Sequence, residues 1–110
     1  MFQMAPKAPD DPILKRFRAA LNEIYGNRID RVVLFGSRAR GDTRLDADYD
    51  VAVFLKTLPD RWAELDRLAK LRVDFLDEAN VFFDAKPYPA EAYRERTPLM
   101  HEIRREGLEL

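Results

Sequence analysis

Apolar residues recur along the chain with two different periods, and these periods divide it into helices and strands. Spacings of three and four residues predict helices over residues 12–25, 60–76 and 98–106, with a shorter helix over 90–96. β-Branched and aromatic runs predict strands over residues 31–35, 49–55 and 81–85. Pro87 and Pro89 are expected to close the third strand. The expected order is helix, strand, strand, helix, strand, helix, helix.

Two dipeptides mark helix starts. Asp11-Pro12 and Thr97-Pro98 each place a capping oxygen before a proline, which suits the first position of a helix. Gly26 and Gly107 are expected to end the same two helices. The residues expected to face the core are Ile13, Leu14, Phe17, Leu21, Ile24 and Tyr25 in the first helix, Trp62, Leu65, Leu68, Ala69, Leu71, Phe75 and Leu76 in the long helix, and Leu99, Met100 and Ile103 in the last.

The composition supports one folded domain. The chain has 110 residues, of which 46% are hydrophobic and 35% are charged. Together with the order of elements, this indicates an α/β fold with a small mixed β-sheet flanked by helices. Residues 1–10 are polar and contain prolines, so we expect a flexible N-terminal tail there and the domain over residues 11–110.

Composition also argues against several classes of site and location. The 19 basic and 20 acidic residues give a net charge of -1, so we expect no direct nucleic-acid binding. The absence of cysteine excludes disulfides, and the single histidine, His101, excludes a multi-histidine metal site. We expect a surface or packing role for His101. The apolar runs are too short for a membrane span, and prolines occupy the N-terminus where a signal peptide would be apolar, so a cytoplasmic protein is expected.

The residues that carry chemistry lie between the first two strands. Gly36 and Ser37 follow the first strand, and Asp48 and Asp50 lead into the second. If these strands pair antiparallel, the four residues share one rim of the sheet, with both aspartates on the same face. The structural alternatives are an ordinary turn and a charged entry to a strand. Asp46 has the same parity and would act instead if the register shifted by two.

Two carboxylates on one face favour a cation as their partner. At ~5 Å and an effective dielectric constant of ~20, their repulsion costs about 3 kcal/mol. Oxygen ligands without nearby cysteine or histidine select a hard ion, Mg²⁺ or Mn²⁺. The Gly36 backbone and the Ser37 hydroxyl suit a phosphate, and Arg38 and Arg40 would add phosphate contacts or form surface ion pairs. Together these groups predict phosphoryl or nucleotidyl transfer.

The pattern Leu-Phe-Gly-Ser-Arg-Ala-Arg-Gly, followed by Asp-Tyr-Asp and an apolar strand, resembles the minimal nucleotidyltransferases of the DNA polymerase β superfamily. The likeness covers most of the chain, from Tyr25-Gly26 to residues 103–107. It implies that Gly36 and Ser37 hold the triphosphate and that Asp48 and Asp50 bind two Mg²⁺ ions. Ala47 stands where many members have serine, which removes one hydroxyl and keeps the metal ligands.

The resemblance also implies a third carboxylate on a later strand, which would help to bind metal and to activate the incoming hydroxyl. Asp84 in the strand over 81–85 is the matching residue, and the structural alternative is a surface acid on an edge strand. Lys86 has the same parity, so it would either border the site or neutralise Asp84.

The implied reaction transfers AMP from ATP, or the equivalent group from another nucleoside triphosphate, to a hydroxyl. The chain has little room for a second substrate-binding domain, so we expect the acceptor on a partner protein. Small members of the family are often paired with a HEPN ribonuclease toxin, which they neutralise by adenylylating a tyrosine. The resemblance therefore implies a HEPN-type toxin as partner.

Two other functions stay open. One is a non-catalytic module that masks a toxin or binds a nucleotide. The other is a nucleotidyltransferase for a small molecule, which would need a cleft that dimerisation completes. The nucleobase, the acceptor hydroxyl and the oligomeric state, a homo-oligomer included, are undecided by the sequence.

Overall fold

The structure is a computed structural model that describes residues 10–41, 44 and 47–110. Nearly all of the expected tail, residues 1–9, therefore lies outside the described residues. The elements in chain order are α1 (Pro12–Tyr25), the 3-10 helix η1 (Gly26–Arg28), β1 (Ile29–Phe35), α2 (Gly36–Ala39), β2 (Tyr49–Leu55), α3 (Arg61–Ala79), β3 (Phe83–Pro89), the 3-10 helix η2 (Ala90–Arg94), α4 (Pro98–Glu106) and β4 (Leu108–Glu109).

The described residues form one mixed sheet with the strand order β3-β2-β1-β4. β1 pairs antiparallel with both β2 and β4, and β2 pairs parallel with β3. The helix α3 is the crossover connection that parallel pairing of β2 and β3 requires. The predicted α/β class, a small mixed sheet with helices against it, is confirmed.

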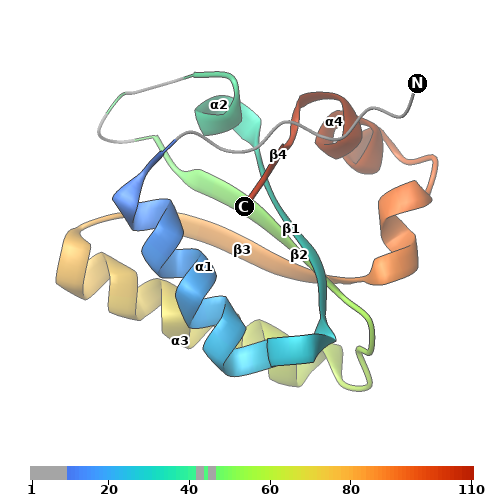
Figure 1. Ribbon diagram of the computed structural model, residues 1–110, viewed down its shortest axis with the longest axis horizontal. Coiled ribbons are helices and arrows are strands. Elements are labelled where there is room, and N and C mark those ends of the chain that lie inside the picture. The colour runs from blue at the N-terminus through green and yellow to red at the C-terminus, as the bar shows by residue number, and fades with distance from the viewer. Residues whose placement is uncertain (1–9, 42–43, 45–46) are drawn as a thin grey trace.

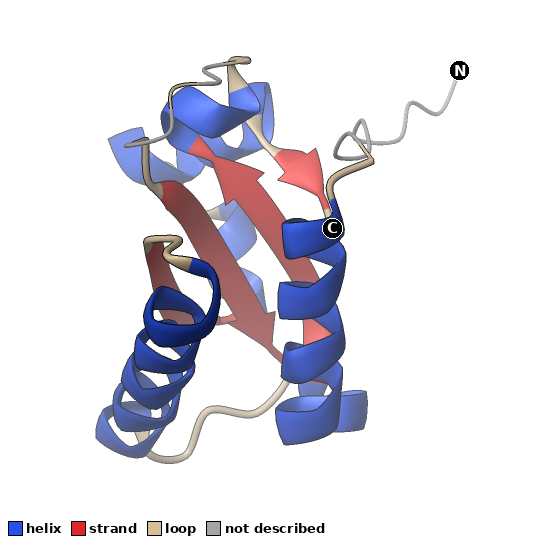
Figure 2. Ribbon diagram, turned by 90° about the vertical axis from the view of Figure 1, so that its left-hand side faces the viewer, coloured by secondary structure: helices blue, strands red, loops and turns tan. Residues whose placement is uncertain are grey.

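Alternating side chains give the sheet two packed faces. The helices α1 and α3 lie side by side over one face (Figures 1 and 2), where Phe17 stacks on Phe83 with 3.9 Å between ring centroids. The other face packs against η2 and α4 through residues such as Phe54 and Ile103. In β2, the side chains of Val51 and Val53 therefore belong to the α1 and α3 face, whereas even-numbered side chains belong to the α4 face.

The predicted helix starts are confirmed. The Asp11 carboxylate accepts a hydrogen bond from the backbone N–H of Ile13 at 2.8 Å, and the Thr97 hydroxyl accepts one from Met100 at 3.1 Å. Asp60 caps α3 in the same way. Each cap supplies an acceptor to a backbone N–H group that has no partner within its helix.

The third strand begins and ends later than predicted. β3 spans Phe83–Pro89, not residues 81–85. Asn80 ends α3 in the left-handed conformation, and the strand begins three residues later. Pro87 does not close the strand because β3 is an edge strand, where the missing N–H group costs no ladder hydrogen bond. The two-residue strand β4 was not predicted, since so short a segment has no recognisable period.

The prediction that Trp62 lies in the core is wrong. Its side chain is 81% exposed, and Glu64 is buried in its place. The helical face that meets the sheet is formed by Glu64, Leu68, Leu71 and Phe75, so Trp62 points elsewhere. A charged residue fits this buried position because Arg28 and Arg67 lie 2.8 and 3.4 Å from the Glu64 carboxylate oxygens. Other residues that were expected to face the core but are exposed are Ile24, Ala69 and Leu99.

Candidate active site

Gly36 lies against Asp50, where β1 ends and β2 begins. The antiparallel register pairs Phe35 with Asp50, which brings the Gly36-Ser37 turn to the start of β2. Gly36 has a φ of +75°, and a Cβ added to it would meet Asp50 Oδ2 at 2.3 Å. Both facts require glycine, because other residues rarely adopt this φ and there is no space for their side chain. Ser37 follows in α2 and is half-buried.

The parallel register of β2 and β3 pairs Asp50 with Asp84. Both have the parity of the side chains that face α4, as does Asp48 two residues earlier. Asp50 and Asp84 are half-buried, and Asp48 is exposed. The three acids predicted from the sequence are therefore grouped at one end of β2 and β3, on the α4 face of the sheet.

The surroundings of Asp50 disfavour its negative charge. Burial raises the pKa of Asp50 above its ordinary value, and the neighbouring charges of Asp84, Asp48 and Glu102 raise it further, while Lys86 opposes them. A carboxylate that is partly withdrawn from water and surrounded by other carboxylates is the arrangement that a cation relieves.

Asp84 also has basic neighbours. Lys86 Nζ lies 3.9 Å from Asp84 Oδ2, and Arg72 Nη1 lies 4.0 Å from Asp84 Oδ1. Arg72 is held there because its Nε donates a hydrogen bond of 2.6 Å to the Phe83 carbonyl. These contacts agree with the prediction that Lys86 shares the face of Asp84. They are also the contacts that a surface acid on an edge strand would make, which was the structural alternative for Asp84.

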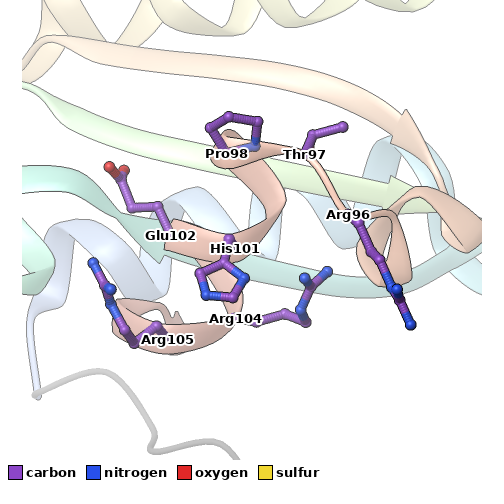
Figure 3. Close-up of a pocket in the computed structure, with 7 residues that line it drawn as sticks. All are labelled: Arg96, Thr97, Pro98, His101, Glu102, Arg104 and Arg105. Carbon is purple, nitrogen blue, oxygen red and sulfur yellow. The ribbon is translucent and has the colours of Figure 1, made fainter.

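Glu102 is a residue near the site that the sequence analysis missed. It lies on α4, and its charge acts on Asp50 from across the sheet face. It also lines an open pocket of about 690 Å³, shown in Figure 3, where Glu102 lies at the opposite end from Arg96. The helical period places Met100 and Ile103 inward, but it does not indicate that Glu102, beside Ile103, approaches Asp50. Only the register of α4 on the sheet could have identified Glu102.

Arg38 and Arg40 both contact protein groups. Arg38 Nε donates to the Ala47 carbonyl at 3.0 Å, and its guanidinium lies 4.2 Å from the centre of the Tyr49 ring. Arg38 thus links the turn after β1 to the start of β2. Arg40 Nη1 lies 3.2 Å from Glu106 Oε2, as the ion-pair alternative predicted. Asp46, the alternative metal ligand, lies outside the described residues.

The carboxylates present fit a hard divalent cation. Within residues 10–41, 44 and 47–110, no group of three or more acidic or histidine side chains is close enough to hold a metal ion by itself. Mg²⁺ in nucleotide sites is bound by one or two carboxylates together with substrate phosphates and water, and does not need a cage made by the protein alone. Asp48 and Asp50 could supply such a pair, with Asp84 beside them.

None of the helices in the part of the chain that the structure describes has the length and apolar character needed to cross a membrane.

Comparison with known proteins agrees with the fold. The profile of the nucleotidyltransferase domain family matches residues 14–100, from α1 into α4. A Methanocaldococcus jannaschii protein named "Putative protein adenylyltransferase MJ0141" is 43% identical to this chain over 47 residues, which are 43% of this chain and 48% of that protein. The match thus spans about half the length of this relative. Because the family profile covers most of the sequence, the chain belongs to the nucleotidyltransferase domain family.

Proposed function

We propose that this protein is a metal-dependent protein adenylyltransferase, which transfers AMP from ATP to a hydroxyl of a partner protein. The observation that carries the proposal is the placement of Asp50 against Gly36 on one side and in register with Asp84 on the other. Family membership supports nucleotidyl transfer as the reaction class, and the name of the M. jannaschii relative supports a protein acceptor.

In this proposal Asp48 and Asp50 hold Mg²⁺, or Mn²⁺, together with phosphate oxygens of the nucleotide. The ions, when bound, neutralise phosphate charge and stabilise the leaving pyrophosphate. Gly36 and Ser37 bind the triphosphate, and Arg38 adds a charged contact. In the structure the Arg38 guanidinium is held by the Ala47 carbonyl and lies over Tyr49, whose side chain belongs to the α1 and α3 face, so in this proposal Arg38 turns towards Asp50 when the nucleotide binds.

Asp84 acts on the acceptor. Its carboxylate orients the attacking hydroxyl and takes its proton, while the acceptor oxygen forms a bond to the α-phosphorus. The bond from that phosphorus to the oxygen bridging to the β-phosphate breaks, and pyrophosphate leaves. The acceptor approaches from the α4 side, because Asp84 and Asp50 belong to that face of the sheet.

The partner that we propose is a HEPN-type ribonuclease toxin, which the protein would neutralise as an antitoxin by adenylylating a tyrosine. The resemblance of the Gly-Ser and Asp-Tyr-Asp motifs to the minimal nucleotidyltransferases supports this choice. A reading frame next to this one that encodes a helical protein with an Arg-x4-6-His motif would strengthen it.

The test is transfer of label from [α-³²P]ATP in the presence of Mg²⁺, with and without the candidate toxin, followed by mass spectrometry of the modified side chain. We expect label on a toxin tyrosine with the wild type and none with the double variant Asp48→Asn/Asp50→Asn. The matched control is Asp30→Asn, an exposed aspartate at the far end of β1 from Phe35, which should keep full activity.

The result also separates the alternatives. If the double variant folds, transfers no AMP and still protects cells from the toxin as well as the wild type does, the protein acts by masking. If label goes to a small hydroxyl compound and not to a protein, the small-molecule reaction is correct.

A further inference from the structure

The helix α3 carries a second apolar stripe that is not used by the core. Trp62, Leu65, Ala69, Val73 and Leu76 follow one another at spacings of three and four residues, so they lie along one side of the helix. The Trp62 side chain is 81% exposed and that of Val73 is 54% exposed. This stripe is separate from the buried face of α3, which lies against the sheet.

An open apolar pocket adjoins the C-terminal half of this stripe. It has a volume of about 370 Å³ and is lined by Ala69, Arg72, Val73, Leu76, Phe82 and Phe83. Phe82, just before the edge strand β3, is 52% exposed and extends the apolar surface beyond the helix. Large exposed apolar side chains gathered beside a pocket are typical of an association surface.

The order of residues in the stripe is symmetric about Ala69. Trp62 and Leu76 lie seven residues on either side of it, and Leu65 and Val73 lie four residues on either side. A two-fold axis through Ala69 that packs α3 antiparallel against a second copy would therefore match the stripe to itself. Trp62 of each copy would reach the pocket beside Leu76 of the other, and the small Ala69 side chains would let the helices approach closely.

The charges beside the stripe favour a second copy over a partner of one charge sign. Asp66 and Lys70 flank it on one side, with 3.4 Å between Lys70 Nζ and Asp66 Oδ2. Antiparallel packing places Asp66 of one copy near Lys70 of the other, so opposite charges meet twice. On the other flank, Arg72 is already engaged by the Phe83 carbonyl and by Asp84. A strongly acidic or basic partner would meet a like charge on the first flank.

We propose that the protein forms a two-fold symmetric homodimer through this side of α3, with Trp62 of each copy seated in the pocket of the other. The helix surface is small for a stable interface, so we expect a weak dimer with a dissociation constant in the micromolar range or above. The interface lies on the α3 side of the sheet, whereas the side chains of Asp50 and Asp84 have the parity of the α4 face.

The test combines sedimentation velocity with the fluorescence of Trp62, which is the single tryptophan of the chain. As the concentration rises through the dissociation constant, we expect the sedimentation coefficient to move from monomer to dimer. Over the same range the Trp62 emission should shift to shorter wavelength, because the ring leaves water.

Two substitutions test the contacts. Trp62→Glu and Val73→Asp should each weaken the dimer by at least about thirtyfold, and thermal unfolding should show that they fold, since both positions are exposed. The matched control is Ile24→Asp, an exposed apolar position on α1, which should leave the dissociation constant unchanged. Asp66→Lys should weaken the dimer, and the charge swap Asp66→Lys/Lys70→Asp should restore it.

A monomer at every concentration with unshifted Trp62 emission would overturn the proposal. So would a dimer that survives Trp62→Glu and Val73→Asp, since the copies would then meet elsewhere. An emission shift that appears only when another protein is added would assign the surface to that partner and not to a second copy.

Discussion

Glu64 and Asp50 are two carboxylates that the fold withdraws from water. The neighbours of Glu64 are cationic, whereas most of the charged neighbours of Asp50 are anionic. Glu64 is only 3% exposed, and Arg28 and Arg67 meet its two oxygens. Asp50 is half-buried, and three of the four charged groups that act on its pKa are carboxylates.

The difference distinguishes an acid whose charge the fold itself neutralises from one whose charge the fold leaves uncompensated. Burial of a carboxylate costs free energy unless cations or hydrogen bonds compensate it. At Glu64 the chain supplies the compensation itself. At Asp50 the compensation is incomplete, which costs folding free energy and leaves the site ready for a cation from solution.

The sharpest test of this comparison is Asp50→Asn. We expect nucleotidyl transfer to fall about a thousandfold, equivalent to roughly 4 kcal/mol of lost transition-state stabilisation. Because the pKa of Asp50 is raised by folding, its ionised form destabilises the fold at neutral pH, so without divalent ions the variant should melt at the same temperature or higher. Label transfer and calorimetry measure the two effects. A variant that stays active would remove Asp50 from the site.

Gly36→Ala tests the close approach between the turn and Asp50. The added methyl group would displace the Asp50 carboxylate, and the turn would hold alanine at a φ of +75°, which it rarely adopts. We therefore expect about a hundredfold loss of activity and a loss of roughly 3 kcal/mol in the free energy of unfolding. Gly26→Ala is the matched control, because Gly26 also has a positive φ, +52°, but open space at its Cβ position. It should lose about 2 kcal/mol in the free energy of unfolding, because its backbone conformation is also one that alanine rarely adopts, and no activity. Equal activity losses in the two variants would refute the steric explanation.

Glu64→Gln tests the compensated acid. The substitution leaves Arg28 and Arg67 without their carboxylate, and since both arginines reach water we expect a loss of about 2 kcal/mol in the free energy of unfolding. The control is Glu78→Gln, whose exposed ion pair with Arg16 should contribute less than about 0.5 kcal/mol. Urea unfolding compares the two. Activity per folded molecule should be unchanged in both.

The smallest expected effect is at high pH. Burial, with the charge of Glu64 added, raises the pKa of Tyr25 from 10 to about 12, against the opposing Arg67 and Arg28. The folded state thus holds the phenolic proton more tightly than the unfolded chain, and this stability is present below pH 10 and lost as the pH rises towards 12. Unfolding free energies should fall less steeply over this range in Tyr25→Phe than in the wild type. Identical slopes would contradict the assignment.

Much of the fold could be predicted because local chemistry determines it. The caps at Asp11 and Thr97 act within one turn of helix, and the spacing of Gly36 and Asp50 places them correctly once two adjacent strands pair. Trp62 was misplaced for the opposite reason. Hydrophobicity suggested that Trp62 is buried, but Arg28, from a distant segment, is what makes a buried Glu64 tolerable.

Part of the geometry of the candidate site could also be predicted. Gly36 and Asp50 share one rim of the sheet as the expected antiparallel pairing required. Asp84 was singled out by the family resemblance alone, because its pairing with Asp50 depends on the parallel register of β3, which alternation within one strand does not give. Glu102 could not be predicted, since its approach to Asp50 depends on how α4 is oriented on the sheet. The roles of these residues in catalysis stay predictions until the variants are measured.

The prolines of β3 limit how copies of this protein can join. Pro87 and Pro89 have no N–H group, so a strand that tried to extend the sheet past β3 would find two donors missing. At the opposite margin, β4 offers only two residues. The missing donors of β3 therefore work against edge-to-edge extension of the sheet on that side, and they favour assembly through helical surfaces.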